Sequence, residues 1–133
     1  MRLIPATLAL CLVSGAALAQ ELAPLNDLAA CRLNSEMVSL TFSYEGGACE
    51  QTGNGSVDLV ESGTATVTIP IVSTADVCTM QAVKVTHTGA INAVAEVSAL
   101  DVQLVSPGGE VQAEGKVDIA PATPDCVPPA PKD

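Results

Sequence analysis

The chain has 133 residues, of which 15 are Asp or Glu and 5 are Lys or Arg, and aromatic residues make up only 2%. Such an acidic surface repels nucleic acid and anionic lipid head groups, and it favours cations or basic partners. With Phe42 and Tyr44 as its only aromatic rings, the chain cannot assemble a large stacking platform for sugars or single-stranded nucleic acid.

Residues 1–19 have the pattern of a cleavable secretory signal peptide. Arg2 gives a basic start, residues 3–13 are nearly all apolar, and Ala17-Leu18-Ala19 forms a small-x-small cleavage site. The apolar run is too short for a membrane-spanning helix, which needs about 20 residues. We therefore predict an exported protein, periplasmic or extracellular, with no membrane span in the mature chain.

Cleavage after residue 19 would remove 19 of the 133 residues and leave 114, enough for one domain. Arg2 would leave with the signal peptide, so four basic residues would face fifteen acidic ones, a formal net charge of −11. Such a balance favours cations or basic partners or merely keeps the protein soluble, and solubility is the preferred interpretation.

The cysteines of the mature chain predict two structural disulfides. Cys11 leaves with the signal peptide, and four cysteines remain, an even number typical of a small exported domain. They are widely spaced and contain no Cys-x-x-Cys pair, which argues against a zinc or redox site. Three pairings can be drawn, and we favour Cys31–Cys49 with Cys78–Cys126.

Residues 20–36 form an N-terminal segment with roughly helical spacing of apolar residues. Asn26 could cap a short helical turn. We expect this segment to be helical or irregular, with Cys31 tying it to the body. The residues that carry the spacing are Leu25, Leu28, Ala29 and Leu33.

The first clear strand pattern follows. Apolar side chains alternate with Ser and Thr from Val38 to Tyr44, the period of a half-buried strand that Gly46-Gly47 ends. Residues 48–56 are rich in Gly, Asn and Ser and are predicted to be a loop. A hairpin follows around Glu61-Ser62-Gly63, although Leu59-Val60 interrupts its alternation.

Pro70 interrupts the second arm of that hairpin. Because proline cannot donate to a sheet ladder, we expect this arm to end there or to lie at an edge. Residues 78–87 form the next predicted strand, with Val83, Val85 and His87 on one face, and Thr88-Gly89 marks a turn.

The last predicted strands surround a clear turn. Residues 91–105 are rich in Val and Ala and predict one long bent strand or two. Ser106-Pro107-Gly108-Gly109 is a turn. Residues 111–119 carry apolar side chains and Gly115 on one parity, and they form a final strand.

Together these patterns predict an all-β domain over residues 37–119, with about six or seven short strands. The spacing favours an immunoglobulin-like or related β-sandwich. Residues 120–133 form a Pro-rich tail that Cys126 could pin to the body. Within that tail, residues 128–131 could alternatively dock in an aromatic groove of a partner.

No catalytic set is recognisable. A Ser-His-acid triad needs a histidine that can pass protons, and the single histidine, His87, lies at a predicted strand end, where we expect a surface residue. We therefore predict no catalytic residues, no cofactor and no enzyme activity, with a carboxylate-dependent enzyme as the least favoured alternative.

The candidate metal ligands are Asn54, Asp58 and Glu61. They place oxygen atoms on or near a flexible loop, as calcium prefers, but their spacing fits no EF-hand. Calcium or another cation is therefore an alternative function. The favoured hypothesis is a non-enzymatic exported protein that binds another protein through an exposed edge strand or the Pro-rich tail, or serves as an envelope accessory.

Overall fold

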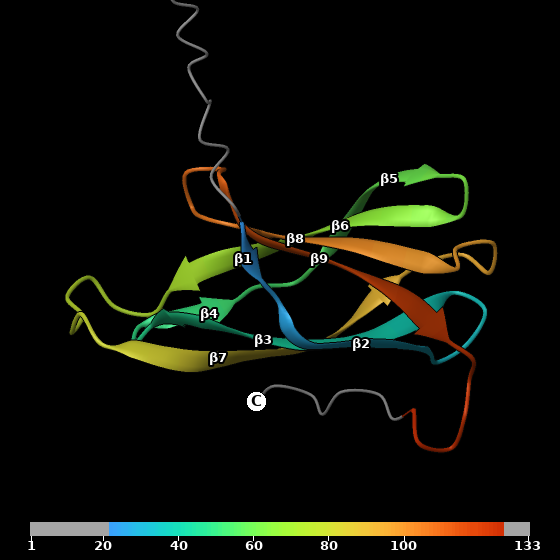
Figure 1. Cartoon of the computed structure of the whole chain (residues 1–133), viewed down its shortest axis with the longest axis horizontal. Coiled ribbons are helices and arrows are strands. Elements are labelled where there is room, and N and C mark those ends of the chain that lie inside the picture. The colour runs from blue at the N-terminus through green and yellow to red at the C-terminus, as the bar shows by residue number, and fades with distance from the viewer. Residues whose placement is uncertain (1–21, 127–133) are drawn as a thin grey trace, which may run out of the picture.

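The computed structural model describes residues 22–126, which contain nine β-strands and no helix (Figure 1). The strands form one mixed sheet that curls into a nearly closed, barrel-like form. The all-β prediction is confirmed, although the arrangement is not clearly an immunoglobulin sandwich. In chain order the strands are β1 Ala23–Pro24, β2 Asn26–Arg32, β3 Met37–Gly47, β4 Glu50–Thr52, β5 Ser56–Glu61, β6 Thr64–Ser73, β7 Ala82–Asn92, β8 Ala99–Val105 and β9 Val111–Ala120.

The sheet follows the order β4, β6, β8, β9, β2, β3 and β7, with β5 also paired to β6 and β1 to β9. β9 joins the two halves, because its first part pairs with β8 and its last residues pair with β2. Figure 1 shows β9 passing from the layer of β6 and β8 to that of β2 and β3. β7 lies close to β4 and β5 but pairs with neither among residues 22–126, so a seam stays open there.

The barrel interior is filled by apolar side chains from alternate positions of β3, β6 and β8. This is the alternation that predicted the strand from Val38 to Tyr44, and its apolar members are all buried. Burying one large apolar side chain stabilises the fold by about 1.5–3 kcal/mol. The largest fully buried side chains are Phe42, Leu40, Ile69, Leu100, Leu104, Val38, Val67 and Val102.

The predicted hairpin is confirmed as β5 and β6. Ser62 and Gly63 connect the strands with φ angles of 50° and 81°, as a two-residue type I′ turn requires. The Gly63 carbonyl accepts hydrogen bonds from the N–H groups of Ser98 (2.8 Å) and Ala99 (3.2 Å). These bonds fix the turn against the start of β8.

Pro70 lies inside β6, so the prediction that the arm ends there or lies at an edge is wrong. β8 pairs with one side of β6, and β5 and then β4 pair with the other. The Pro70 carbonyl accepts a hydrogen bond from the Gly53 N–H at 2.8 Å. Because the N–H and C=O of one strand residue point to the same side, the N–H that proline lacks would fall between β5 and β4, and no ladder bond is lost.

The N-terminal segment is extended, so the expectation of a helical turn is wrong. β1 runs parallel to β9, and β2 pairs with both β3 and β9. Asp27 has a φ of 52°, and the register of β2 against β3 shifts at this point. The break lets Leu25 and Leu28 both pack over Gly115 of β9, where an added Cβ would lie 2.8 Å from Leu28 Cδ2. The helix-like spacing therefore comes from an interrupted strand.

β7 begins four residues later than predicted and runs through Thr88-Gly89, so the predicted turn is wrong. An added Cβ on Gly89 would lie 2.9 Å from Nε2 of His87. The close approach of the His87 ring, and not a turn, therefore explains why a glycine stands at this position. Of the two options for residues 91–105, two strands are present, because β7 ends at Asn92 and β8 begins at Ala99.

The two disulfides join Cys31 to Cys126 and Cys49 to Cys78, with Cα–Cα distances of 5.9 and 5.8 Å. Two disulfides were predicted, but the favoured pairing of Cys31 with Cys49 and Cys78 with Cys126 is wrong. Cys31 lies opposite Ala120 at the end of β9, so the tail that leaves this strand starts beside it. Cys126 thus pins the start of the tail to the body, as expected.

Two predicted segments lie outside the described residues, namely the signal peptide of residues 1–19 and the proline motif of residues 128–131. Both stay predictions. Across residues 22–126, no helix has the length and apolar character needed to cross a bilayer.

Candidate binding surfaces

His87 is only 3% exposed, so the prediction of a surface residue at a strand end is wrong. It lies in the middle of β7, and its Nδ1 forms a 2.7 Å hydrogen bond with Thr52 Oγ1 of β4. Its ring stacks on Phe42 with 4.9 Å between centroids. The bond to Thr52 bridges the seam between β4 and β7, where the described residues form no backbone ladder, whereas Phe42 is the cross-strand partner of His87 on β3. The position of His87 is therefore explained by packing at the seam.

The three predicted metal ligands lie on the loop before β5 and on β5 itself. The carboxylate of Asp58 accepts hydrogen bonds from Thr68 Oγ1 and from Ser56 Oγ, which hold it against the hairpin. Across residues 22–126, no three His, Cys, Asp or Glu side chains gather in a way that could hold a metal ion. A cation site formed by Asn54, Asp58 and Glu61 stays a prediction.

A pair of carboxyl groups lies on the outer face of β8 and β9. The Glu114 side chain forms a hydrogen bond with Asp101, and this bond, followed by burial and the negative charge of Asp101, raises the pKa of Glu114 against the opposing effect of Lys116. A hydrogen bond between two carboxyl groups requires a proton, so this pair favours the protonated form of Glu114.

Tyr44 lies beside a hollow of about 440 Å³ at one end of the barrel. Its hydroxyl donates a 3.4 Å hydrogen bond to Glu50 Oε2. Burial, the charge of Glu50 and this hydrogen bond raise the pKa of Tyr44 to about 12. The phenol therefore stays protonated at neutral pH and acts as a hydrogen-bond donor.

The second half of β5 projects from the barrel as the outer arm of the β5–β6 hairpin (Figure 1). Leu59 is 53% exposed and Val60 is 49% exposed. Neighbouring strand residues point to opposite faces, so the exposure of both means that neither face is covered here. The interrupted alternation at Leu59-Val60 is the sequence pattern that marks this surface.

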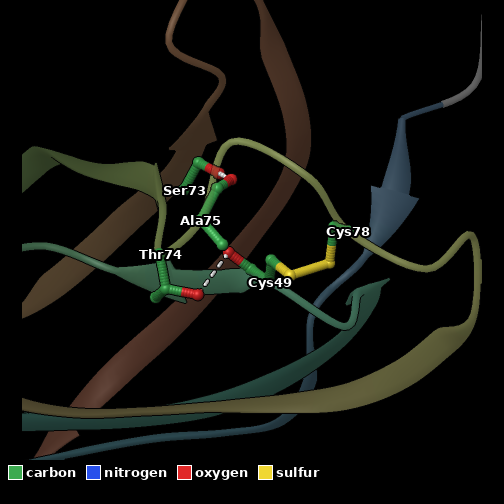
Figure 2. Close-up of a disulfide and its surroundings, with 5 residues drawn as sticks. All are labelled: Cys49, Ser73, Thr74, Ala75 and Cys78. Atoms are coloured by element: carbon green, nitrogen blue, oxygen red, sulfur yellow. Dashed lines mark hydrogen bonds between the residues drawn. A yellow bond between two sulfur atoms is a disulfide. The ribbon is translucent and has the colours of Figure 1, made fainter.

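The connection between β6 and β7 is a second exposed surface, which we call the 74–81 loop. Every residue from 72 to 82 is exposed. Thr74 donates two hydrogen bonds to the Cys49 carbonyl, from its N–H (2.8 Å) and its Oγ1 (3.1 Å), and Ser73 Oγ donates to the Ala75 carbonyl at 2.8 Å. Figure 2 shows these residues around the Cys49–Cys78 disulfide.

The 74–81 loop includes residues 78–81, which the sequence pattern predicts as the start of a strand. The alternation of polar and apolar residues holds from residue 74 to 77 and breaks at Cys78-Thr79, and this break is the pattern that could have indicated the loop.

No family model matches the chain, and neither a curated protein nor a solved structure matches it. The two disulfides point to an oxidising, extracytoplasmic location, because thiols in the cytoplasm are kept reduced.

Proposed function

We propose that the chain is an exported, non-enzymatic protein that binds another protein along the free edge of β5, as a binding module or an envelope accessory. The observation that carries the proposal is the joint exposure of Leu59 and Val60, two adjacent apolar residues of one strand. Exposed apolar edges pair readily with other chains, and proteins use such edges to accept extended peptides.

The hairpin geometry indicates which backbone groups are available at this edge. With a two-residue turn, Glu61 and Thr64 are the closing hydrogen-bonded pair. Hydrogen-bonded and non-hydrogen-bonded pairs alternate along an antiparallel ladder, so Val60 directs its N–H and C=O away from β6. A partner strand would use these groups for its first ladder bonds.

The surrounding charges favour a segment that carries both apolar and basic residues. Asp58 and Glu61 flank the exposed pair on the same strand. Acidic side chains outnumber basic ones in the whole sequence, 15 to 5. Apolar contact with Leu59 and Val60 would supply affinity, and the acidic neighbours would select basic segments.

The export signal and the oxidising location support a role outside the cytoplasm. Residues 1–19 have the pattern of a secretory signal peptide, and the disulfides would persist after export. The partner would therefore be met in the periplasm or outside the cell. Binding through the Pro-rich tail stays a prediction, because residues 127–133 lie outside the described range.

The proposal is tested by affinity capture from the native envelope or medium without reducing agent, followed by identification of the bound proteins. Val60→Pro removes the outward N–H and should weaken capture about tenfold, which corresponds to ~1.4 kcal/mol. Leu59→Ser with Val60→Ser keeps the backbone edge and should weaken it similarly.

The matched control is Val94→Ser, because Val94 is also exposed but lies outside the hairpin. Capture should be unchanged in this variant. Partners that bind wild type and all edge variants equally would show that β5 is not the binding surface.

A further inference from the structure

We propose that the 74–81 loop is a second binding element, a substrate-like loop that occupies the active-site cleft of a serine endopeptidase whose primary specificity pocket is apolar. Met80 would enter that pocket, and the chain would act as an inhibitor of the enzyme. This surface lies outside the β5 hairpin, so the proposal does not depend on strand addition there.

The first observation is the exposure of two large apolar side chains within the 74–81 loop. Met80 is fully exposed and Val77 is 90% exposed. They lie three residues apart in a segment whose neighbours are also exposed. The two side chains suit separate pockets along an extended cleft better than one flat apolar patch.

The second observation is the way in which the body holds both sides of Met80. Two residues before it, Cys78 is bonded to Cys49. Two residues after it, Ala82 pairs with Gly47 at the start of the β7 ladder. Gly47 and Cys49 are only two residues apart. The disulfide and the Ala82–Gly47 strand pair therefore close a small ring, and Met80 is the middle residue of its exposed segment from Cys78 to Ala82.

This ring explains how a cleavable segment could inhibit instead of being consumed. Hydrolysis of the Met80–Gln81 bond would add water across it and create two new chain ends. The Cys49–Cys78 disulfide would hold one end, and the β7 ladder would hold the other. Neither end could leave the cleft quickly, so the enzyme would stay occupied. A loop fixed in advance also loses little conformational freedom on binding, which favours high affinity.

The chemistry of the central residue selects the class of enzyme. The primary pocket of serine endopeptidases sets which side chain is accepted, with an apolar slot in chymotrypsin and a carboxylate in trypsin. Met80 is uncharged and apolar, so it matches the first type. An exported protein with two disulfides would also meet secreted endopeptidases in its own compartment.

The test measures inhibition of chymotrypsin, subtilisin, elastase and trypsin by the purified protein with both disulfides formed. We expect inhibition of at least one of the first three, with a constant on the order of micromolar or tighter, and none of trypsin. Met80→Lys should weaken inhibition of that enzyme about 100-fold and create inhibition of trypsin. Val94→Lys adds the same charge at another exposed site. This variant should inhibit the first enzyme as wild type does and should not inhibit trypsin.

A second variant tests the ring itself. Cys49→Ser with Cys78→Ser frees one side of the loop, and we expect cleavage after Met80 with loss of lasting inhibition. The proposal is overturned if the folded wild type inhibits none of the four enzymes, or if inhibition is unchanged by Met80→Lys. Equal inhibition by the ring-opened variant would overturn the role given to the disulfide. Val60→Pro should leave the inhibition of these enzymes unchanged, and this result separates the present proposal from the one at β5.

Discussion

The disulfide between Cys31 and Cys126 lies beside the barrel wall, whereas that between Cys49 and Cys78 lies at the foot of an exposed loop. The first joins residues 95 positions apart and ties the tail to β2. The second joins residues 29 positions apart and holds a segment with no buried side chain. Sheet pairing of β2 with β3 and β9 orders the chain on one side of the first disulfide, while the loop at the second is held by the disulfide itself and by hydrogen bonds to the Cys49 carbonyl.

This difference suggests that the first disulfide serves mainly stability and the second mainly recognition of a partner. A cross-link that closes a longer loop removes more conformational freedom from the unfolded chain, in the chain-entropy account. A cross-link beneath an exposed loop can instead fix the shape of a surface that a partner meets. The two regions should therefore respond differently when their disulfides or side chains are changed.

The largest expected effect is on the stability of the two disulfide-free variants. Cys31→Ser with Cys126→Ser should lower the free energy of unfolding by about 4–5 kcal/mol, and Cys49→Ser with Cys78→Ser by about 3–4 kcal/mol. Urea unfolding of each variant, with the other disulfide intact, measures both. If opening the shorter loop were the more damaging change, the division of roles would be contradicted.

The second prediction compares a buried with an exposed apolar side chain. Leu100 of β8 is fully buried, so Leu100→Ala should lower the free energy of unfolding by about 2–5 kcal/mol. Met80→Ala should change it by less than about 0.5 kcal/mol. Thermal and urea unfolding provide the measurement, and a large loss of stability for Met80→Ala would show that the loop belongs to the core.

A smaller effect is expected at Arg32, the residue after Cys31. Its guanidinium donates to the carbonyls of Ala93, Val94 and Val97 at 2.5, 2.6 and 2.9 Å. Arg32→Lys keeps the charge but loses the planar fork, so the free energy of unfolding should fall by about 1–2 kcal/mol. The unfolding midpoint measures this change. A lysine variant as stable as wild type would show that these contacts contribute little.

The smallest expected effect is a pH dependence at Glu114. Because its pKa is raised above the ordinary 4.5, the folded protein holds this proton more tightly than the unfolded chain. The contribution to stability is therefore present below pH 4.5 and is lost as pH rises through the raised pKa. Glu114→Gln should be more stable than wild type at neutral pH, with a gap that narrows in acid. Unfolding at several pH values measures it, and a constant gap would contradict the carboxyl-pair explanation.

The strands that could be predicted from sequence are those in which polar and apolar residues alternate regularly along the strand itself. Alternation indicated β3, the β5–β6 hairpin and β9, since one face of each is apolar. Local spacing failed at Leu25 and Leu28, because an irregular strand at Asp27 produced a three-residue repeat. It also failed at Pro70, whose missing N–H is harmless only because β5 and β4 do not meet there.

The sites were harder to predict because they depend on contacts between distant segments. Nothing near His87 in the sequence shows that Thr52 and Phe42 would enclose it. The ring around Met80 exists only because Cys49 follows the end of β3, the strand that pairs with β7. At β5, by contrast, the interrupted alternation at Leu59-Val60 was visible, and it corresponds to the exposed edge.

The central claim is that a Cys49–Cys78 disulfide closes a ring that presents Met80. The most direct test is disulfide mapping by mass spectrometry after digestion of the native protein in acid without reduction. We predict one linked peptide pair containing Cys49 and Cys78 and a second containing Cys31 and Cys126. A link between Cys31 and Cys49 would contradict the ring and the loop geometry built on it.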